Sequence, residues 1–296
     1  MSNNHITRRE ALKRLGLGLA GMAVTPLGSS ALFTSCSPKP RKRLLFYFTA
    51  TGNSLYAAQK FTGELLSIPQ VMKGEERTFE ADEIGLVFPD YRAEAPPMVK
   101  RFIQEVKLKA PYLFSIITFG NYDCNVVETW DNFAKEQGTQ FHYITTIKMV
   151  DNYLPVFDMN EQVKIDKKED EQLAKAVSEV EENKHYIPTL TEEERKRAEQ
   201  VLTFVPPLYP VTAQQLLSIN QEDCVGCGIC SRVCPRSNFE FTGNGVACSG
   251  DCEFCLACIH NCPQKAIVLR RGERNPKARY RHPDISLNEI IRSNKQ

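Results

Sequence analysis

Apolar positions in the N-terminal half of the chain alternate between two periods. The run 44–48 is short, apolar and rich in strand-favouring residues, and Leu55, Ala58 and Phe61 then follow at helical spacing. Such an alternation of strand and helix is typical of an α/β domain built around a parallel sheet. Further strands are expected at 84–88, 113–119 and 141–149, and further helices at 97–106 and 126–136.

Two more helices are expected beyond this region, at 167–183 and 191–204. Thr191 is followed directly by three glutamates, which suits an N-cap with acidic residues in the first helical turn. The stretch 161–199 holds twelve acidic residues against eight Lys or Arg, which favours a solvated helical linker over a docking face for a basic partner. The prolines of 204–211, "FVPPLYPV", then stiffen the chain.

Composition leaves room for two domains and excludes one class of partner. The chain has 296 residues, 42% of them hydrophobic and 25% charged, as expected of a globular protein of this size. With 37 Lys plus Arg against 36 Asp plus Glu, the net charge of +1 gives no electrostatic case for nucleic-acid binding. The eleven cysteines are the unusual feature. Eight of them lie in two runs, 224–235 and 252–263, and Cys36, Cys124 and Cys248 lie outside these runs.

The eight clustered cysteines form two runs with one spacing. "CVGCGICSRVCP" occupies 224–235 and "CEFCLACIHNCP" occupies 252–263, each with cysteines at i, i+3, i+6 and i+10 before a proline. A disulfide knot or two zinc ions are alternatives, but neither explains the third cysteine or the fourth. The spacing C-x2-C-x2-C-x3-C-P is the bacterial ferredoxin signature, in which the fourth cysteine of a run serves the other cluster.

This rule assigns the ligands of two 4Fe–4S clusters. Three closely spaced thiolates on a tight loop can hold three irons of a cubane, and the fourth iron is held from a distance. Gly226 and Gly228 permit the turns of the first run. The expected sets are Cys224, Cys227, Cys230 and Cys262 for one cluster, and Cys252, Cys255, Cys258 and Cys234 for the other.

The turn after the strand at 44–48 is rich in hydroxyl groups. A strand, a loop of small residues and a helix together make a phosphate cradle, because backbone N–H groups and the helix N-terminus face the anion. The sequence has no Walker lysine and no G-x-G-x-x-G here, which disfavours a nucleoside triphosphate or a Rossmann dinucleotide. An ordinary capped turn between strand and helix remains the alternative.

The stretch "FTATGNS" resembles the phosphate loop of flavodoxins, T/S-x-T-G-x-T/S, with Ser54 in the last hydroxyl position. The resemblance implies a flavodoxin-like doubly wound parallel sheet and bound FMN. In flavodoxins two further loops hold the flavin ring, and they correspond here to 88–91 and 118–122. The residues expected to contact FMN are Thr49, Ala50, Thr51, Gly52, Asn53, Ser54, Tyr91, Phe119 and Gly120, and Tyr122 is a further tyrosine that could stack on the ring.

As a whole, the chain resembles a bacterial family in which a flavodoxin-like domain is fused to a dicluster ferredoxin. The likeness includes "GDCEFCLACIHNCPQKAI" and the tail "NPKARYRHPDISLNEII". The basic tail could fold back on acidic parts of the chain, bind a partner or stay solvated. The implied organisation is a flavodoxin-like domain at 43–157, a helical linker at 158–214, a small α+β ferredoxin domain at 215–272 and the tail at 273–296.

The N-terminus predicts export. Residues 1–36 contain a pair, Arg8 and Arg9, before an uncharged stretch that glycines and a proline interrupt, which resembles a twin-arginine signal. Cys36 lies in a lipoprotein-like box and is a candidate lipid anchor. The basic residues of 39–43 oppose translocation, so retention in the cytoplasmic membrane or cytoplasm is the alternative to anchoring on its outer side.

These features predict an electron-transfer protein that passes single electrons between a flavin and two clusters, with unknown redox proteins as partners. The alternatives are a flavin-dependent reductase whose clusters feed the flavin, and a binding domain with an empty flavodoxin fold. The sequence shows no catalytic constellation. Cys124, in the ring-loop region, is the only residue that suggests a catalytic role, and we expect it to be a buried residue without one. His260, inside the second run, is expected to serve packing.

Overall fold

The computed structural model of the chain describes residues 41–204, 207–243 and 245–294. The expected export signal at 1–36, with its arginine pair and Cys36, lies outside the described residues, so export and lipidation stay predictions. Within the part of the chain that the structure describes, no helix combines the length and the apolar character that crossing a bilayer requires.

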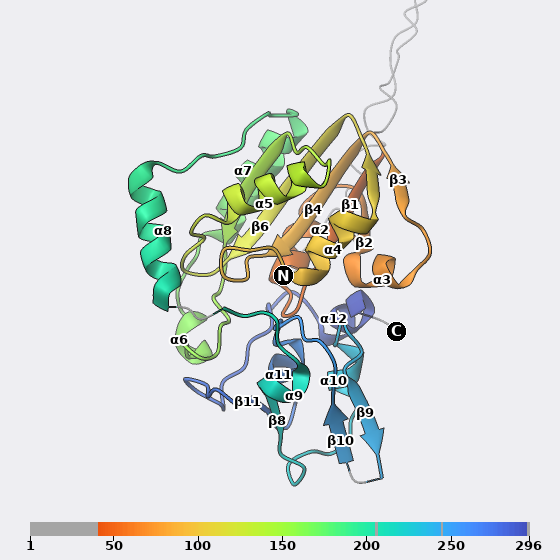
Figure 1. The fold of residues 1–296 in the computed structure, drawn as a ribbon, viewed down its shortest axis with the longest axis vertical. Helices are drawn as coiled ribbons and strands as arrows, with labels where there is room; N and C mark the ends of the chain where they lie inside the picture. The colour runs from red at the N-terminus through yellow and green to blue at the C-terminus, as the bar shows by residue number, and fades with distance from the viewer. Residues whose placement is uncertain (1–40, 205–206, 244, 295–296) are drawn as a thin grey trace, which may run out of the picture. The chain divides into compact units, whose positions relative to one another are not determined.

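A five-stranded parallel sheet forms the centre of the flavodoxin-like part (Figure 1). Its spatial order, β2-β1-β4-β6-β7, becomes 2-1-3-4-5 when these five strands are counted along the chain. This is the order of the flavodoxin-like doubly wound fold, in which ligands bind beyond the carboxyl ends of the strands. The strands are β1 (Arg43–Tyr47), β2 (Glu64–Ser67), β4 (Glu83–Pro89), β6 (Tyr112–Phe119) and β7 (Tyr143–Lys148).

Helices cover both faces of this sheet. On one face α3, α4 and α5 bury side chains such as Phe102 and Trp130 against the strands, and on the other α2, α7 and α12 bury Leu55, Leu173 and Ile290. The expected α/β class is therefore confirmed. The helices are α2 (Asn53–Gln59), α3 (Ile68–Lys73), α4 (Pro97–Glu105), α5 (Val126–Glu136), α7 (Glu169–Glu181) and α12 (Leu287–Asn294).

The strand β2 is absent from the sequence-based expectation. It has four residues, lies at the edge of the sheet beside β1, and begins with the exposed Glu64. A short, half-exposed edge strand lacks the continuous apolar run that marks the central strands of a parallel sheet. The pattern also fails to predict β3 (Thr78–Glu80) and β5 (Lys107–Lys109), which form a separate parallel pair.

Helix α7 packs against one face of the sheet, although the sequence analysis placed this segment in the linker 158–214. The side chain of Arg43 in β1, only 4% exposed, binds Glu83 of β4 (Nη2 to Oε2, 2.5 Å) and Glu181 of α7 (Nη1 to Oε1, 2.6 Å). Removal of one partner from such a buried group would leave an uncompensated charge. The linker is therefore shorter than expected.

The shorter linker contains α8 (Glu192–Phe204), which lies along the side of the flavodoxin-like part at the left of Figure 1. Ala198 is its buried residue, and Arg195 joins it to α5 through Glu128 (Nη2 to Oε1, 2.7 Å). The acidic first turn expected at 192–194 is present and exposed.

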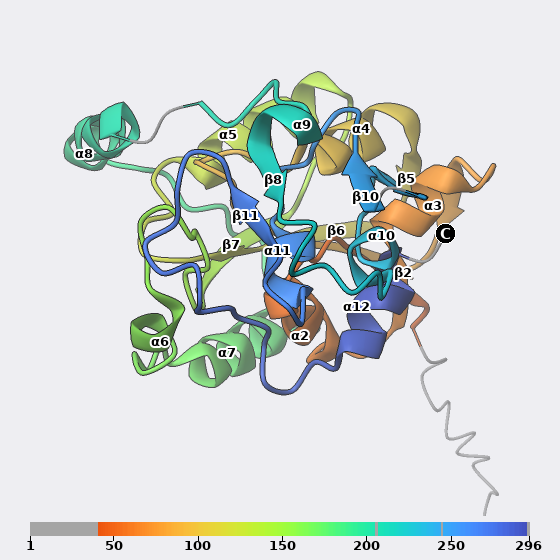
Figure 2. The same cartoon turned by 90° about the horizontal axis from the view of Figure 1, so that it is seen from below.

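The cysteine-rich segment consists of short helices and two antiparallel strand pairs, and Figure 2 shows the molecule from the side of this segment. Its core includes Phe239, Val246, Phe254 and Ile259 together with several cysteines. The expected small α+β ferredoxin-like fold is confirmed. Its elements, with the preceding α6, are α6 (Met159–Gln162), α9 (Ala213–Leu216), β8 (Leu217–Ile219), α10 (Ile229–Arg232), β9 (Phe239–Thr242), β10 (Gly245–Cys248), α11 (Ala257–Asn261) and β11 (Ile267–Leu269).

Of the three possibilities for the tail, folding back is the one observed. Helix α12 lies beside α3 in both views (Figures 1 and 2), and its Ser293 Oγ is 3.0 Å from the hydroxyl oxygen of Tyr47 in β1. Arg279 binds Glu273 of the tail itself (Nη1 to Oε2, 2.7 Å), and His282 Nε2 lies 3.2 Å from Glu169 Oε1 in α7. The tail therefore forms part of the flavodoxin-like part's surface.

Gly85 at the centre of β4 provides a test of the sheet packing. A Cβ atom at this position would overlap the ring of Phe114 and crowd Leu45 Cδ2 (2.8 Å). We expect Gly85→Ala to lower the free energy of unfolding by about 1–3 kcal/mol, because overpacked cores shift side chains and backbone. Urea unfolding of the full chain measures it, with Gly74→Ala, whose Cβ would meet only an ordinary contact at 3.5 Å, as control. Equal stability of the two variants would contradict this packing.

Candidate functional site

The loop between β1 and α2 is a candidate anion cradle. Thr49 and Thr51 are 3% exposed and Ser54 is 1% exposed, so the loop is buried despite its polarity. The Ser54 hydroxyl is held by Thr118 Oγ1 of β6 at 2.8 Å. Among the residues that the structure describes, none accepts a hydrogen bond from the backbone N–H groups of Thr51, Asn53 or Ser54. Buried N–H donors without acceptors beside a cavity are suited to a phosphate.

A cavity of about 440 Å³ opens beside this loop. Residues that follow β4, β6 and β7 complete its polar wall, at the carboxyl ends of the strands where this fold binds ligands. Its size lies within the range of about 300–1,000 Å³ that is usual for small-molecule sites. Eight of the nine residues expected to contact FMN line it: Thr49, Ala50, Thr51, Asn53, Ser54, Tyr91, Phe119 and Gly120.

Gly52 is the ninth expected residue, and it does not line the cavity. Its φ is +107°, a conformation that favours glycine. A Cβ atom here would lie 2.9 Å from His282 Cβ and 3.0 Å from Ile285 Cβ. The glycine of the motif is thus required by its backbone conformation and by the packing of the C-terminal tail against the outside of the loop.

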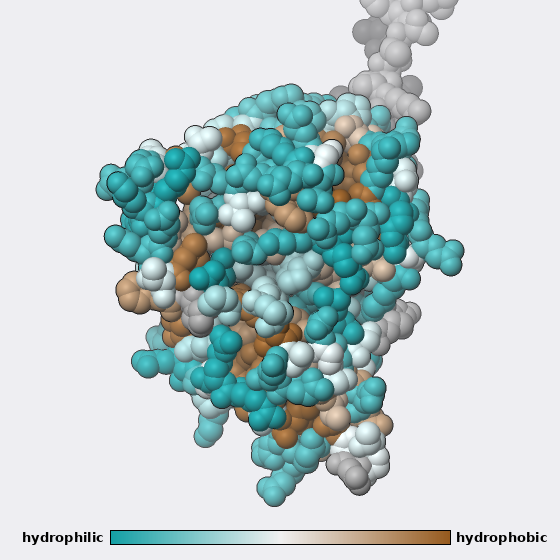
Figure 3. Space-filling view, in the orientation of Figure 1, coloured by the Kyte–Doolittle hydropathy of each residue, from teal (hydrophilic) through white to brown (hydrophobic). Residues whose placement is uncertain are grey.

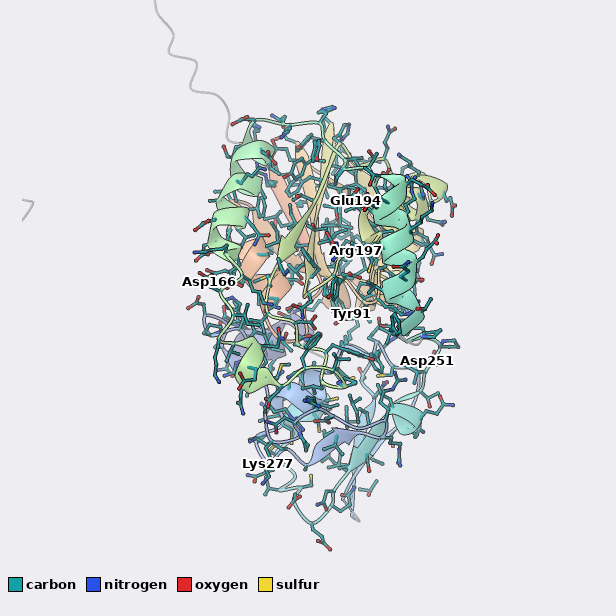
Figure 4. The ribbon with its side chains drawn as sticks, turned by 90° about the vertical axis from the view of Figure 1, so that its left-hand side faces the viewer. Tyr91, Asp166, Glu194, Arg197, Asp251 and Lys277 are labelled. Atoms are coloured by element: carbon teal, nitrogen blue, oxygen red, sulfur yellow. The ribbon has the colours of Figure 1, made fainter. Side chains whose placement is uncertain are left out.

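The two tyrosines expected near a flavin ring differ in position. Tyr91 lines the cavity where the flavodoxin-like part meets the cysteine-rich segment (Figure 4), and its ring lies against Phe48. Burial raises the pKa of the Tyr91 phenol well above its ordinary value. Tyr122 also lines the cavity but is 58% exposed. Tyr91 is therefore the better placed of the two to pack on a ring.

Two carboxyl groups lie in the polar wall of the cavity. Asp90 Oδ1 is buried and has no hydrogen-bond partner among the described residues, and burial raises the pKa of Asp90 well above its ordinary value. Asp151 accepts a hydrogen bond from the backbone N–H of Asn121 (2.9 Å), and burial raises its pKa as well. Asp151 lies directly over Gly120, where any Cβ atom would overlap it.

The eight clustered cysteines separate into two groups of four around two smaller cavities. The grouping is the one expected from cross-ligation, although binding of iron by these thiols stays a prediction. Each cavity takes three cysteines from one run and the fourth from the other. Cys224, Cys227, Cys230 and Cys262 line one cavity, and Cys252, Cys255, Cys258 and Cys234 line the other.

A short helix in each run brings its fourth cysteine to the cavity of the other run. Helix α10 contains Cys230 and ends before Cys234, while α11 contains Cys258 and ends before Cys262. Four residues of helix advance the chain by about 6 Å, which moves the fourth cysteine of each run away from its own loop. None of the ten described cysteines forms a disulfide.

The thiols stand around each cavity rather than converging on one point. Among the described residues, no three His, Cys, Asp or Glu side chains are arranged to hold a single metal ion. A cubane differs because each of its four irons takes its own thiolate. Burial raises the pKa of Cys252 to about 12 and those of Cys255 and Cys258 well above the ordinary value. Their thiolates would therefore need the positive charge of bound iron.

The two runs share a backbone conformation but not the residues that adopt it. Gly226 and Gly228 have φ of 65° and 73°, and the equivalent Phe254 and Leu256 have φ of 51° and 61°. A non-glycine residue in this region costs of order 1–3 kcal/mol. Both side chains are nonetheless well buried, 3% and 5% exposed.

The strained residues Phe254 and Leu256 lie where the large cavity adjoins the cysteine cavity of the second run. Phe254, Cys255 and Leu256 line the large cavity, and Cys255 and Leu256 also line the cysteine cavity of the second run. One candidate iron ligand thus forms part of the wall of the candidate flavin site.

Several residues at the site were not found by sequence reasoning. Asn152 lines the large cavity and donates to Thr51 Oγ1 (2.6 Å), Tyr280 donates to Asn53 Oδ1 (2.7 Å), and His282 packs on Gly52. These residues lie in irregular segments, so no periodic pattern indicates them. The only available signal was that the tail combines aromatic and basic residues.

Comparison with known proteins identifies the cysteine-rich segment. Residues 217–237 match a family model described as a 4Fe-4S binding domain. Over 58 residues, 18% of this chain and 97% of the relative, the chain is 36% identical to a ferredoxin of Methanothermococcus thermolithotrophicus. It is 35% identical over 57 residues to an uncharacterized ferredoxin of Methanocaldococcus jannaschii, covering 18% of this chain and 74% of that protein.

Solved structures similar to the chain include two putative flavoproteins. One, from Bacteroides uniformis, is 16% identical with a TM-score of 0.29 and covers 37% of this chain and 92% of its own. The other, from Bacteroides eggerthii, is 18% identical with a TM-score of 0.29 and covers 38% of this chain and 91% of its own. The fold assignment rests on the strand order and not on these likenesses.

Cys124 offers a test of the environment inside the large cavity. Burial, with the nearby Asp90 and Asp123 carboxyls, raises the pKa of its thiol to about 11. Compared with a free cysteine of pKa about 8.5, we expect alkylation at pH 8 to be about two orders of magnitude slower, with the rate rising up to pH 11. Iodoacetamide labelling followed by peptide mass spectrometry measures it, with the unfolded chain as reference. Equal rates in the folded and unfolded chain at pH 8 would refute the assignment.

Proposed function

Because this chain belongs to the ferredoxin family through its cysteine-rich segment, we propose that it is an electron carrier that passes single electrons between FMN and two 4Fe–4S clusters. The observation that carries the proposal is the shared wall, since Cys255 and Leu256 line both the flavin cavity and a cysteine cavity. Electron tunnelling weakens steeply with distance, so two redox groups separated by one layer of side chains can exchange electrons directly.

The residues present fit both kinds of cofactor. The free N–H groups and hydroxyls of 49–54 would hold the phosphate of FMN, and the loops that contain Tyr91 and Phe119 would hold its ring. Each cysteine cavity offers four thiols, the number that a cubane requires. When bound, a flavin exchanges one or two electrons and a cubane one, so the pair can divide a two-electron supply into single steps.

The arrangement suggests an order for the two clusters. The cluster held by Cys234 and the second run would adjoin the flavin. The cluster held by the first run would lie nearer the surface, because Cys227 is exposed and Val225 and Phe241 beside its cavity are 65% and 48% exposed. Figure 3 shows hydrophobic patches among hydrophilic residues on this face, some of them on the lower part of the molecule. A redox partner would exchange electrons at this outer cluster.

A flavin-dependent reductase is the second candidate, and Asp90 is the observation that favours it. Reduction of a substrate at the ring requires a proton donor within reach. The Asp90 carboxyl lines the cavity, has an unpartnered oxygen, and its raised pKa favours the protonated form. Steady-state turnover with small electron acceptors separates this candidate from the carrier.

We also propose that the twin-arginine route exports the chain in folded form and that Cys36 anchors it on the outer side of the cytoplasmic membrane. Thiols that hold clusters would be exposed to oxidation if the chain crossed unfolded into an oxidising compartment. Fractionation of cells that express the native chain and a variant with Arg8 and Arg9 both replaced by Lys tests this proposal.

Chemical analysis tests the clusters. We expect about eight iron and eight sulfide per chain in anaerobically purified protein, from two cubanes. Cys234→Ala should reduce iron to about four by damaging the cluster of Cys252, Cys255 and Cys258, while Cys248→Ala should leave it unchanged. Electron paramagnetic resonance identifies the affected cluster. Loss confined to the cluster of the first run would contradict the cross-ligation.

Titration with FMN tests the flavin site. We expect one FMN per chain and expect Ser54→Glu to abolish its binding, because a carboxylate in the loop repels phosphate and occupies its space. The matched control is Ser178→Glu, an exposed position on α7. Flavin fluorescence measures the affinity. Binding of FMN to Ser54→Glu with the wild-type affinity would refute the assignment of the loop.

A further inference from the structure

Residues 278–285, which we call the strap, cross the outside of the phosphate loop. The backbone N–H of His282 donates to the carbonyl oxygen of Thr51 (2.8 Å), and the Tyr280 hydroxyl donates to Asn53 Oδ1 (2.7 Å). Ile285 and the Cβ of His282 pack against Gly52. Three successive residues of the loop are thus fixed from the side opposite the cavity.

The strap is itself anchored to two helices of the sheet. The His282 side chain is 1% exposed and stacks on the ring of Tyr56 in α2, with 4.0 Å between ring centroids. Its Nε2 lies 3.2 Å from Glu169 Oε1 in α7. Ile285 is also buried, at 1% exposure. The strap is therefore a fixed part of the structure, able to hold the loop in one conformation.

The strap also reaches the second cysteine run, through His260. The backbone N–H of Tyr280 donates to His260 Nδ1 (3.1 Å), and His260 Nε2 lies 3.0 Å from the carbonyl oxygen of Asn152. Asn152 in turn donates to Thr51 Oγ1 (2.6 Å). Two hydrogen-bonded routes, one through Tyr280 and one through Asn152, therefore join His260 to the phosphate loop.

The position of His260 depends on the cysteines around it. It lies in α11, a helix of five residues that contains Cys258 and is followed by Cys262. Isolated helices this short are unstable in water, so tertiary ties must hold α11 in place. Cys258 in the helix and Cys262 directly after it line different cavities, so iron bound in either cavity would hold α11 in place.

From this arrangement we infer that Tyr280 and His260 are positioning residues that link the phosphate loop to the clusters. The inference rests on the proposed function and extends it: bound clusters fix α11, His260 fixes the strap and Asn152, and these fix the loop that binds the phosphate of FMN. Coupling of binding free energies is reciprocal, so bound FMN must also stabilise the clusters.

Tyr280→Phe tests the first half of the link, because it removes one hydroxyl and keeps the ring and the backbone N–H. In the cluster-loaded full chain, we expect the Kd for FMN to rise about threefold to tenfold, the effect of losing one hydrogen bond. The Kd for riboflavin, which lacks the phosphate, should stay unchanged. The matched control is Tyr47→Phe, which removes a buried hydroxyl that contacts α12 instead of the loop.

The second half of the link is tested by the rate at which an iron chelator bleaches the clusters, followed by absorbance with and without saturating FMN. We expect FMN to slow bleaching in the wild-type chain and in Tyr47→Phe. In Tyr280→Phe the same saturation with FMN should give clearly less protection. A general loss of stability would instead raise the bleaching rate equally with and without FMN.

The outcomes separate this inference from the proposed function. If the wild-type chain binds no FMN, the proposed function and the inference both fail. If it binds FMN but Tyr280→Phe leaves the Kd and the protection unchanged, the inference alone fails. If Tyr280→Phe weakens FMN and riboflavin to the same extent, the strap does not act through the phosphate loop, and the inference fails as well.

Discussion

The fourth cysteine of each run lies at the cavity of the other run, and the rest of the C-terminal segment depends on that exchange. Its strands have only three or four residues, too few to build a substantial core by themselves. With Cys234 and Cys262 exchanged, the two runs cannot separate without opening both cavities. If the proposed clusters are bound, their binding would be coupled to the folding of this segment, as it is in small metal-binding domains.

The two runs have nearly the same backbone but face different surroundings. The first run meets its positive φ angles with glycine and leaves Val225 exposed, as expected of a loop that faces solvent or a partner. The second run has strained backbone at Phe254 and Leu256, and the apolar side chains of these two residues form part of the wall of the large cavity. Backbone strain that persists in a buried wall is typical of functional sites. This difference between the runs supports the proposal that the cluster of the second run would lie inside, beside the large cavity, and that of the first run near the surface.

The sequence was sufficient for features with a strong local signal. Central strands, the larger helices, the grouping of the cysteines around two cavities and eight of the nine expected residues along the large cavity could be predicted, because each depends on a periodic pattern or a fixed spacing. Binding of FMN and iron by these residues stays a prediction. The edge strand β2 escaped because it is short and half exposed, and α7 was misplaced because its buried face resembles that of any amphipathic linker helix. The strap could not be predicted, since its ties to Thr51 and His260 join segments far apart in the chain.

In a redox protein made of two parts, efficient electron transfer requires a constant separation between the parts. Hydrogen bonds at defined points fix this separation better than apolar contact alone. Glu253, 2% exposed and next to two candidate ligands, accepts a hydrogen bond from the backbone N–H of Met98 (3.0 Å) at the start of α4 and lies 2.7 Å from Arg236 Nε. His260 and the strap make a second fixed point on the other face of the sheet. Hydrogen bonds have directional geometry, so sliding of one part over the other would break both points. Both sets of hydrogen bonds would therefore hold the large cavity and the cysteine cavity of the second run, which share Cys255 in their walls, at one separation.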